Sequence, residues 1–339
     1  MDADAFRPEQ VGDLRAVRHG TGRGTQYTQS GHGAAAGSTA PRHPSLTTTV
    51  PKEFVHRASV AEVMLTGWER ADECRFAVTA QWPRGHIFFT SVNGCHDPLI
   101  AAETLRQIGS LLAHAEYAVP LGHHFLMRDL SLTVRPEHLL VGGAPASLDI
   151  DVVCEDVRMR RENLAGLRYT AVMRRAGQVV ATGAASFTCM TSKVYQRLRA
   201  DRLNNAGPQL ALTAPTAPQN VGRVSPTDVV LSPVGRPGRW QLRVDTRHPV
   251  LFEHPVDHIP GMMLLEAARQ AAVATAGEDA MPLSLTGQFS RYAELDTPCA
   301  IDARRLPHTD QEQTAVQVTG HQDGNPVFRS TVTVAAPAA

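Results

Sequence analysis

The chain has 339 residues, of which 42 % are hydrophobic, and its formal net charge is zero. This length favours about two domains with packed cores. The neutral balance gives no electrostatic case for binding nucleic acid or an anionic membrane. No run of about 18 apolar residues occurs, so no transmembrane helix is predicted.

Five cysteines are scattered through the chain without paired spacing: Cys74, Cys95, Cys154, Cys189 and Cys299. An odd, unpaired set argues against a disulfide framework or a zinc module and fits a reducing compartment. The first residues lack the charged-then-apolar pattern of a secretory signal, and no dinucleotide or phosphate-cradling glycine motif is present. We therefore expect a cytoplasmic protein that binds no metal and no cofactor.

The first 50 residues are rich in Gly, Thr, Ser, Arg and His and contain few large apolar side chains. Such a segment cannot bury enough surface to fold alone. Residues 1–50 are therefore predicted to be a disordered tail.

Residues 51–200 are predicted to form the first domain. Strands are predicted over 76–83, 86–89, 128–134, 148–159, 167–175 and 178–190, and apolar and polar residues alternate in the first, third and fourth of these. Ala176-Gly177 separates the last two and predicts a hairpin turn. A long helix is predicted after the second of these strands.

This helix begins at Asp97-Pro98, because proline is tolerated in a first turn and the aspartate can cap free amides. Apolar residues form one stripe along it: Ala101, Leu105, Ile108, Leu112 and Ala115. Polar residues occupy the opposite face: Glu103, Arg106, Gln107 and Ser110.

Residues 201–225 are rich in Pro, Ala and Asn, are aperiodic, and are predicted to be a linker. From residue 226 to 339 the first plan repeats. Strands are predicted at 240–245, 250–252, 283–295 and 299–306, with a hairpin over 314–334 that turns at Asp323-Gly324-Asn325. The second helix follows Pro260.

Both helices carry the signature Glu-x-x-Arg-Gln, first as Glu103, Arg106 and Gln107 and then as Glu266, Arg269 and Gln270. Such recurrence indicates an internal duplication. The predicted fold is α+β: a tandem, or double, hotdog. In each copy a curled antiparallel sheet wraps around one long central helix, and the two copies pair sheet edge to sheet edge as an intramolecular pseudo-dimer.

In this arrangement the free amides and dipole of a helix N-terminus can stabilise an oxyanion, and a carboxylate further along can act as a general base. Glu266, flanked by Met262 and Val273, is favoured as the base, and Glu103 is the second candidate. The alternative is a solvated Glu–Arg pair on each helix surface, which the recurrence of the whole signature disfavours.

Histidines precede both helices. His96 lies seven positions before Glu103 and His258 lies eight before Glu266, so the two are not assumed to be equivalent. A nucleophilic Cys95 is disfavoured, because consecutive residues rarely aim at one point. A zinc site at His254, Asp257 and His258 is also disfavoured, because prolines interrupt that stretch.

Two stretches resemble the repeat of the A-factor synthase (AfsA-like) family. One is HPVLFEHPVDHIPGMMLLEAARQAA, residues 248–272. The other is AQWPRGHIFF followed by HDPLIAAETLRQIGSLLAHAEYAVPLGHHF, which ends at Phe125. The resemblance covers most of the chain outside the predicted tail and linker.

The resemblance implies an acyltransferase that makes γ-butyrolactone, butenolide or furan autoregulators of secondary metabolism in actinobacteria. A β-ketoacyl group would pass from a thioester of acyl carrier protein or coenzyme A to dihydroxyacetone phosphate. The catalytic candidates are Glu266, Glu103, His258 and His96. The substrate-binding candidates are Arg269, Arg106, Gln270, Gln107, His254, Gly261 and Met262, with an arginine as the phosphate clamp. A monomer with pseudo-dimeric repeats and a homodimer are both compatible.

Two other functions stay open. A hotdog thioesterase or dehydratase would act on the same acyl thioesters, with water in place of the alcohol in the thioesterase. A non-catalytic regulatory protein would bind an acyl ligand without turnover. Fold alone cannot separate these, because function depends on the site.

Overall fold

The structure is a computed structural model, and it describes residues 47–277, 280–307 and 313–335. Of the tail predicted for residues 1–50, residues 1–46 lie outside the described residues. Val50 is buried and donates its amide to the carbonyl of Leu65 (3.0 Å). Residues 48–339 form one unit, in which no described helix has the length and apolar character needed to cross a membrane.

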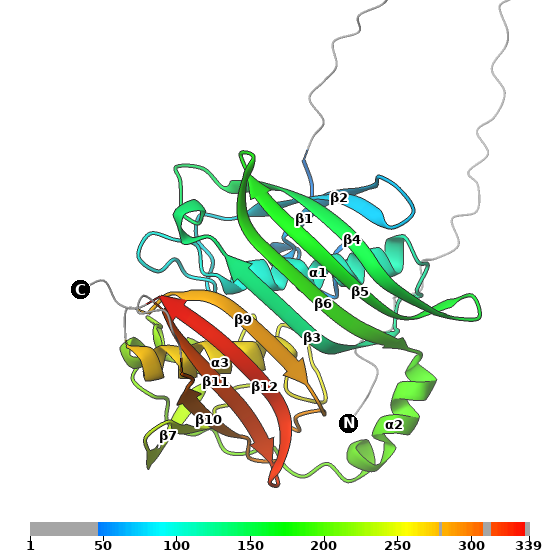
Figure 1. Cartoon of the computed structure of the whole chain (residues 1–339). Helices are drawn as coiled ribbons and strands as arrows, with labels where there is room; N and C mark the ends of the chain where they lie inside the picture. Colours follow the sequence, from blue (N-terminus) through cyan, green and yellow to red (C-terminus); the bar gives the residue numbers. More distant parts are fainter. Residues whose placement is uncertain (1–46, 278–279, 308–312, 336–339) are drawn as a thin grey trace, which may run out of the picture. The chain divides into compact units, whose positions relative to one another are not determined.

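The first repeat contains one long helix and six strands (Figure 1). Its elements are η1 (Lys52–Val55), η2 (Val60–Glu62), β1 (Leu65–Arg70), β2 (Arg75–Trp82), α1 (Leu99–Ala115), β3 (His124–Val134), η3 (Pro136–His138), β4 (Ala146–Arg160), β5 (Asn163–Arg175) and β6 (Gln178–Met190). A second helix, α2 (Ser192–Asn204), then leads toward the second repeat.

The second repeat has the same plan. Its elements are η4 (Pro218–Val221), η5 (Pro226–Asp228), β7 (Leu231–Arg236), β8 (Arg239–Leu242), α3 (Gly261–Ala276), β9 (Pro282–Phe289), β10 (Ala300–Arg305), β11 (Gln313–Gln322) and β12 (Asn325–Ala335). The segment predicted as a linker, 201–225, contains the last turn of α2, the whole of η4 and the buried Arg223.

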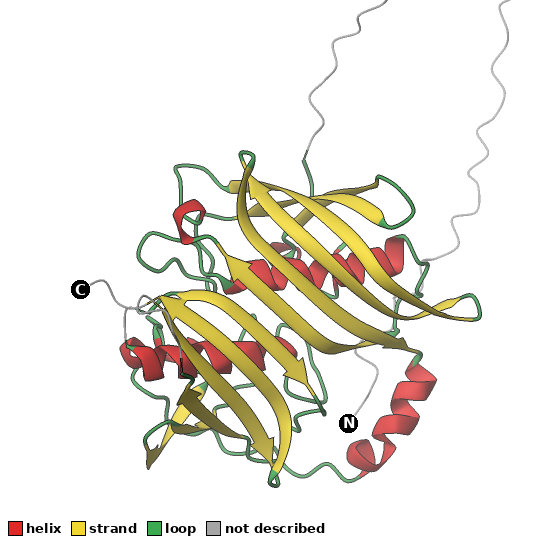
Figure 2. Cartoon of the chain, viewed as in Figure 1, coloured by secondary structure: helices red, strands yellow, loops and turns green. Residues whose placement is uncertain are grey.

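The twelve strands of the described residues belong to one antiparallel sheet, in the order β1-β2-β4-β5-β6-β3-β9-β12-β11-β10-β8-β7. The first six strands and the last six follow the same pattern, and they meet where β3 pairs with β9, from Asp129 opposite Gln288 to Thr133 opposite Ser284. Each half of the sheet lies over its own long helix (Figure 2). The tandem hotdog and its edge-to-edge pairing are therefore confirmed.

The long helices are buried on nearly all sides, so the solvated polar face considered from the sequence is wrong. Fifteen of the 17 residues of α1 are buried. The sheet covers the apolar stripe, and the segment before β1 covers the polar face. There Gln107 donates to the carbonyl of Glu62 (2.7 Å) and accepts from the amide of Met64 (2.9 Å). Gln270 makes the same two bonds with Asp228 (2.8 Å) and Val230 (3.0 Å).

The strands predicted at 86–89 and 250–252 are wrong, because a histidine turns the chain at both places. Nδ1 of His86 accepts from the amides of Phe88 and Phe89, both at 3.1 Å. Nδ1 of His248 accepts in the same way from the second and third amides that follow it, at 3.2 and 3.0 Å. Backbone amides bound to an imidazole cannot join a strand ladder, although the side chains are apolar and buried.

Both predicted hairpin turns are confirmed. Ala176 and Gly177 have φ of 48° and 79°, and Asp323 and Gly324 have φ of 50° and 73°. Two successive positive φ angles are the geometry of the tight turn that matches the twist of paired strands. Helix α2 was not predicted, because Tyr195 and Arg199 are its only buried residues and no apolar stripe marks it.

Close packing of α1 on the sheet depends on Gly109. A Cβ there would lie 2.6 Å from the Tyr169 hydroxyl and 2.9 Å from the Phe187 ring. We expect Gly109→Ala to lower the free energy of unfolding by up to about 2 kcal/mol, because overpacking (about 1–3 kcal/mol) outweighs the helix propensity of alanine (about 1 kcal/mol). Urea denaturation measures the change. Gly85→Ala, with no atom within 4 Å of the added Cβ, is the control and should leave stability nearly unchanged.

Candidate active site

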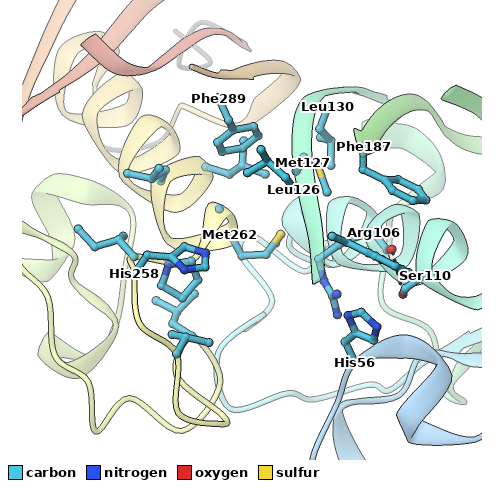
Figure 3. Close-up of a pocket in the computed structure, with 18 of the residues that line it drawn as sticks. His56, Arg106, Ser110, Leu126, Met127, Leu130, Phe187, His258, Met262 and Phe289 are labelled. Carbon is cyan, nitrogen blue, oxygen red and sulfur yellow. Dashed lines mark hydrogen bonds between the residues drawn. The ribbon is translucent and has the colours of Figure 1, made fainter. Parts of the chain in front are cut away.

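A cavity of about 310 Å³ lies between the two repeats (Figure 3). The first repeat contributes residues that follow η1 and residues of α1, β3, β5 and β6. The second repeat contributes the loop before α3, the first turns of that helix, and the end of β9 with the residues after it. Its apolar lining includes Leu126, Met127, Leu130, Phe187, Met262 and Phe289. In Figure 3, Met262 lies between His258 on one side and Arg106 with His56 on the other.

Glu103 forms a buried ion-pair cluster beside this cavity. Its carboxylate accepts two hydrogen bonds from Arg106 (2.8 and 3.0 Å) and one from Gln107 (2.6 Å). Arg57, which follows η1, binds both carboxylate oxygens (3.0 and 2.6 Å). Burial alone would raise the pKa of Glu103, but the charges and hydrogen bonds of the two arginines outweigh burial and lower this pKa to about 2. The carboxylate is therefore ionised, and it fixes both guanidinium groups.

Glu266 forms the same cluster in the second repeat. It accepts two hydrogen bonds from Arg269 (2.9 and 2.7 Å), one from Arg223 (2.8 Å) and one from Gln270 (2.5 Å), and a second nitrogen of Arg223 forms an ion-pair contact with it (2.7 Å). Here too the arginines outweigh burial and lower the pKa of the carboxyl to about 2. The Arg106 side chain is 19 % exposed and lines the cavity, whereas that of Arg269 is 4 % exposed and does not.

The two long helices differ at their N-termini. Asp97 closes the start of α1: its carboxylate accepts from the amide of Leu99 (2.8 Å), as predicted, and is itself paired with Arg223 (3.1 Å). At α3 the preceding residue is Pro260, which offers no side-chain cap. The amides of Gly261 and Met262 donate no hydrogen bond within the described residues, and both residues line the cavity. These amides can therefore bind a ligand oxygen.

His258 lies on the loop before α3 and lines the cavity. Its Nδ1 is 2.7 Å from a carboxylate oxygen of Asp257, which can only accept, so Nδ1 carries the proton. Burial would raise the pKa of Asp257, but hydrogen bonds from His258 and Tyr195 outweigh it and hold the pKa well below its usual range. Nε2 of His258 makes no hydrogen bond within the described residues and is left as the basic nitrogen.

His56, at the end of η1, is a second imidazole on the cavity wall. Its Nε2 is 2.7 Å from Nε2 of His114, and Nδ1 of His114 donates to the carbonyl of Val119 (2.6 Å). Burial, together with the charges of His114 and Arg106, lowers the pKa of His56 to about 3. His56 is therefore neutral at ordinary pH.

The structure brings six of the predicted site residues to the cavity: Glu103, Arg106, His254, His258, Gly261 and Met262. The others, which are His96, Gln107, Glu266, Arg269 and Gln270, do not line it. His96 is buried with its ring against Trp82 (5.6 Å). The catalytic or binding roles assigned from the sequence stay predictions.

Several cavity residues were missed, among them His56, Arg57, Tyr195, Arg291 and Tyr292. One signal was available: Val-His-Arg-x-Ser at 55–59 matches Val-Gly-Arg-x-Ser at 221–225, and it places one arginine against each glutamate. Among the described residues, no group of three or more His, Cys, Asp or Glu could hold a metal ion.

Comparison with known proteins gives one consistent result. The family described as the A-factor biosynthesis hotdog domain matches residues 38–191 and 208–337. A 2-oxo-3-(phosphooxy)propyl 3-oxoalkanoate synthase of Streptomyces virginiae is 57 % identical over 84 % of this chain and 96 % of its own length. The synthase of the same name from Streptomyces griseus is 45 % identical over 81 % of this chain and 92 % of its own length.

Among solved structures, a putative oleoyl thioesterase from Lactobacillus plantarum superposes with a TM-score of 0.51 at 9 % identity. The match covers 79 % of this chain and 99 % of the thioesterase. At that identity the likeness concerns the fold alone.

The buried cluster at Glu266 generates a stability prediction. Glu266→Gln removes the charge that two buried guanidinium groups share, and breaking a buried ion pair costs about 3–5 kcal/mol. We expect the free energy of unfolding to fall by that amount in chemical denaturation. The control is Glu155→Gln at an exposed position of β4, which should change stability by less than about 0.5 kcal/mol. Equal effects of the two variants would contradict a structural role for Glu266.

Proposed function

Because this chain belongs to the A-factor biosynthesis (AfsA) hotdog family, we propose that it is an A-factor synthase. It transfers a 3-oxoacyl group to a hydroxyl of dihydroxyacetone phosphate in γ-butyrolactone biosynthesis. The observation that carries this function is 57 % identity, over 84 % of the chain, to a relative named for the ester product. That product is the 2-oxo-3-(phosphooxy)propyl ester of a 3-oxoalkanoate.

We propose that the start of α3 stabilises the developing oxyanion. Attack of the acceptor hydroxyl on the thioester carbonyl places negative charge on the carbonyl oxygen. The amides of Gly261 and Met262, which donate no hydrogen bond within the described residues, and the positive end of the helix dipole support this role. The start of α1 offers no equivalent oxyanion site, because Asp97 caps it.

His258 is the general base of the proposed reaction. Its Nε2 takes the proton of the acceptor hydroxyl as the new C–O bond forms. The tetrahedral intermediate then collapses, the C–S bond breaks, and the same proton passes to the leaving thiolate. A proton on Nδ1, held by Asp257, supports this assignment because it leaves Nε2 as the acceptor.

Arginines bind the phosphate of the acceptor. Arg106 is the partly exposed member of the Glu103 cluster, and Arg291 lines the cavity with an exposed guanidinium that makes no ion pair within the described residues. A guanidinium can bind phosphate through two parallel hydrogen bonds. Glu103, ionised and saturated with donors, serves to orient Arg106 and Arg57 rather than to accept a proton.

The 3-oxoacyl chain occupies the apolar part of the cavity. Met262 and Phe289 of the second repeat face Leu126, Met127 and Leu130 of β3 there (Figure 3). Methionine adapts its shape to irregular ligands, which suits a flexible chain.

An acyl carrier protein delivers the donor in this proposal. The outer face of α2 exposes Val194 (41 %) and Leu198 (61 %), flanked by Lys193 and Arg197, which form no ion pair within the described residues. This small apolar patch with two positive charges suits an acidic partner, and the helix that carries it reaches the cavity through Tyr195.

The lining of the cavity comes from a single chain, which favours a monomer. Free thiols at all five cysteines favour the cytoplasm.

The function predicts a two-substrate reaction. Purified protein mixed with a 3-oxoacyl thioester and dihydroxyacetone phosphate should form the phosphorylated ester, detected by mass spectrometry, only when both are present. Free 3-oxo acid at the same rate with or without the acceptor would indicate a thioesterase instead. Acyl binding without any product would indicate a regulatory protein.

The carrier proposal predicts a selective kinetic effect. The double variant Lys193→Glu, Arg197→Glu should raise KM for a carrier-bound donor by about tenfold, because two attractions become repulsions. The KM for a pantetheine thioester should stay unchanged. Arg160→Glu with Arg329→Glu, on exposed parts of the sheet, is the matched control. Equal KM changes for carrier, coenzyme A and pantetheine donors would contradict docking on α2.

A further inference from the structure

Helix α2 belongs to neither hotdog segment. The family match stops at residue 191 and resumes at 208, and α2 spans Ser192–Asn204 between them. Its first turn is capped by Thr191, whose hydroxyl accepts from the amide of Val194 (3.3 Å). Two of its residues are buried, Tyr195 at 7 % exposed and Arg199 at 4 %, and both face the loop before α3.

Both buried residues bind the same carboxylate. The Tyr195 hydroxyl donates to one oxygen of Asp257 (2.5 Å), and Nε of Arg199 donates to the other (3.2 Å). Nη2 of Arg199 also donates to the Asp257 backbone carbonyl (3.2 Å). Burial and the bond to Asp257 raise the pKa of Tyr195, so the hydroxyl stays protonated and remains a donor. Asp257 is thus held at both oxygens and at its backbone.

Arg199 is itself fixed from a second side. Two of its nitrogens donate to the two carboxylate oxygens of Glu294 (2.5 and 2.8 Å), and its guanidinium lies over the Tyr292 ring (4.4 Å). That ring meets the His258 ring edge-on at 4.9 Å. The Arg199 guanidinium therefore contacts both the Asp257 carboxylate, which binds His258, and the Tyr292 ring, which packs against His258.

Tyr195 also connects the helix to the first repeat. The ring of His124, at the start of β3, stacks on it in parallel with centroids 3.7 Å apart. Tyr195 lies between β3 and the loop that carries Asp257, and it lines the cavity with His124 and His258. A solvated aspartate, 26 % exposed here, could otherwise rotate away from the imidazole.

We infer that α2 is a positioning element for the acyl transfer: Tyr195 and Arg199 hold Asp257 so that His258 presents Nε2 to the acceptor hydroxyl. The inference rests on the proposed function, in which His258 is the base. Neither residue touches the reacting atoms. Their contribution is to fix the tautomer and the direction of the imidazole, because a misplaced catalytic group can lose about 10²-fold in rate.

A double-mutant cycle tests this role. Tyr195→Phe should lower kcat for ester formation by about 10- to 100-fold with KM for both substrates unchanged. In the His258→Ala background the same substitution should have no further effect, because it acts through His258. Arg199→Lys should keep more activity than Arg199→Met. Gln196→Ala, on the solvent side of α2, is the control and should match the unmodified protein.

An equal loss from Tyr195→Phe with and without His258 would overturn the inference, as would a change in KM alone. A second readout does not depend on activity. The proton on Nδ1 of His258, bound to Asp257, should give a downfield NMR signal that Tyr195→Phe and Arg199→Met shift or broaden. If the unmodified protein makes no ester, the proposed function fails while this signal still reports on positioning. An unchanged signal in both folded variants would refute the positioning role by itself.

Discussion

The fold depends on a carboxylate buried in the middle of each long helix and shared by two arginines. A lone ionised carboxylate would be very costly to bury, but each of these accepts four hydrogen bonds, three of them from guanidinium groups, and forms one further ion-pair contact. One arginine comes from the same helix, and the other comes from the segment before the first strand. The cluster therefore attaches that segment to the polar side of the helix, while the sheet covers the other sides.

The two repeats share this cluster but differ at the helix starts, and that difference places the cavity at the start of α3 and not at the start of α1. In the first repeat Asp97 occupies the amides of α1 and pairs with Arg223, whose guanidinium also lies over the Phe88 ring (4.4 Å). In the second repeat Pro260 offers no side-chain cap, and the amides of Gly261 and Met262 donate no hydrogen bond within the described residues. Glu103 and the start of α3 therefore contribute to one cavity, whereas Glu266 and the start of α1 are enclosed by protein.

Much of the fold was predictable because it is local. The helices follow from spacing, the hairpins from two residues with positive φ, and the duplication from the repeated signature. The turns at His86 and His248 were mistaken for strands because apolar composition does not reveal an imidazole that binds two amides. The sequence favoured Glu266 over Glu103 because of the apolar residues near it on its helix. The second arginine that binds each glutamate could not be included in that comparison, because it lies 46 positions from Glu103 and 43 positions from Glu266 in sequence. Helix α2 carries no apolar stripe, so its contacts with Asp257 could not be foreseen.

The pairing of β3 with β9 has a consequence for how the site behaves in dilute solution. Two separate hotdog subunits that shared a site would dissociate as their concentration fell, and the site would be lost with them. Here one chain holds both halves at a fixed high local concentration, so the cavity is intact in a single molecule. An enzyme built in this way keeps its site at any dilution, because no second chain has to bind before the cavity is formed.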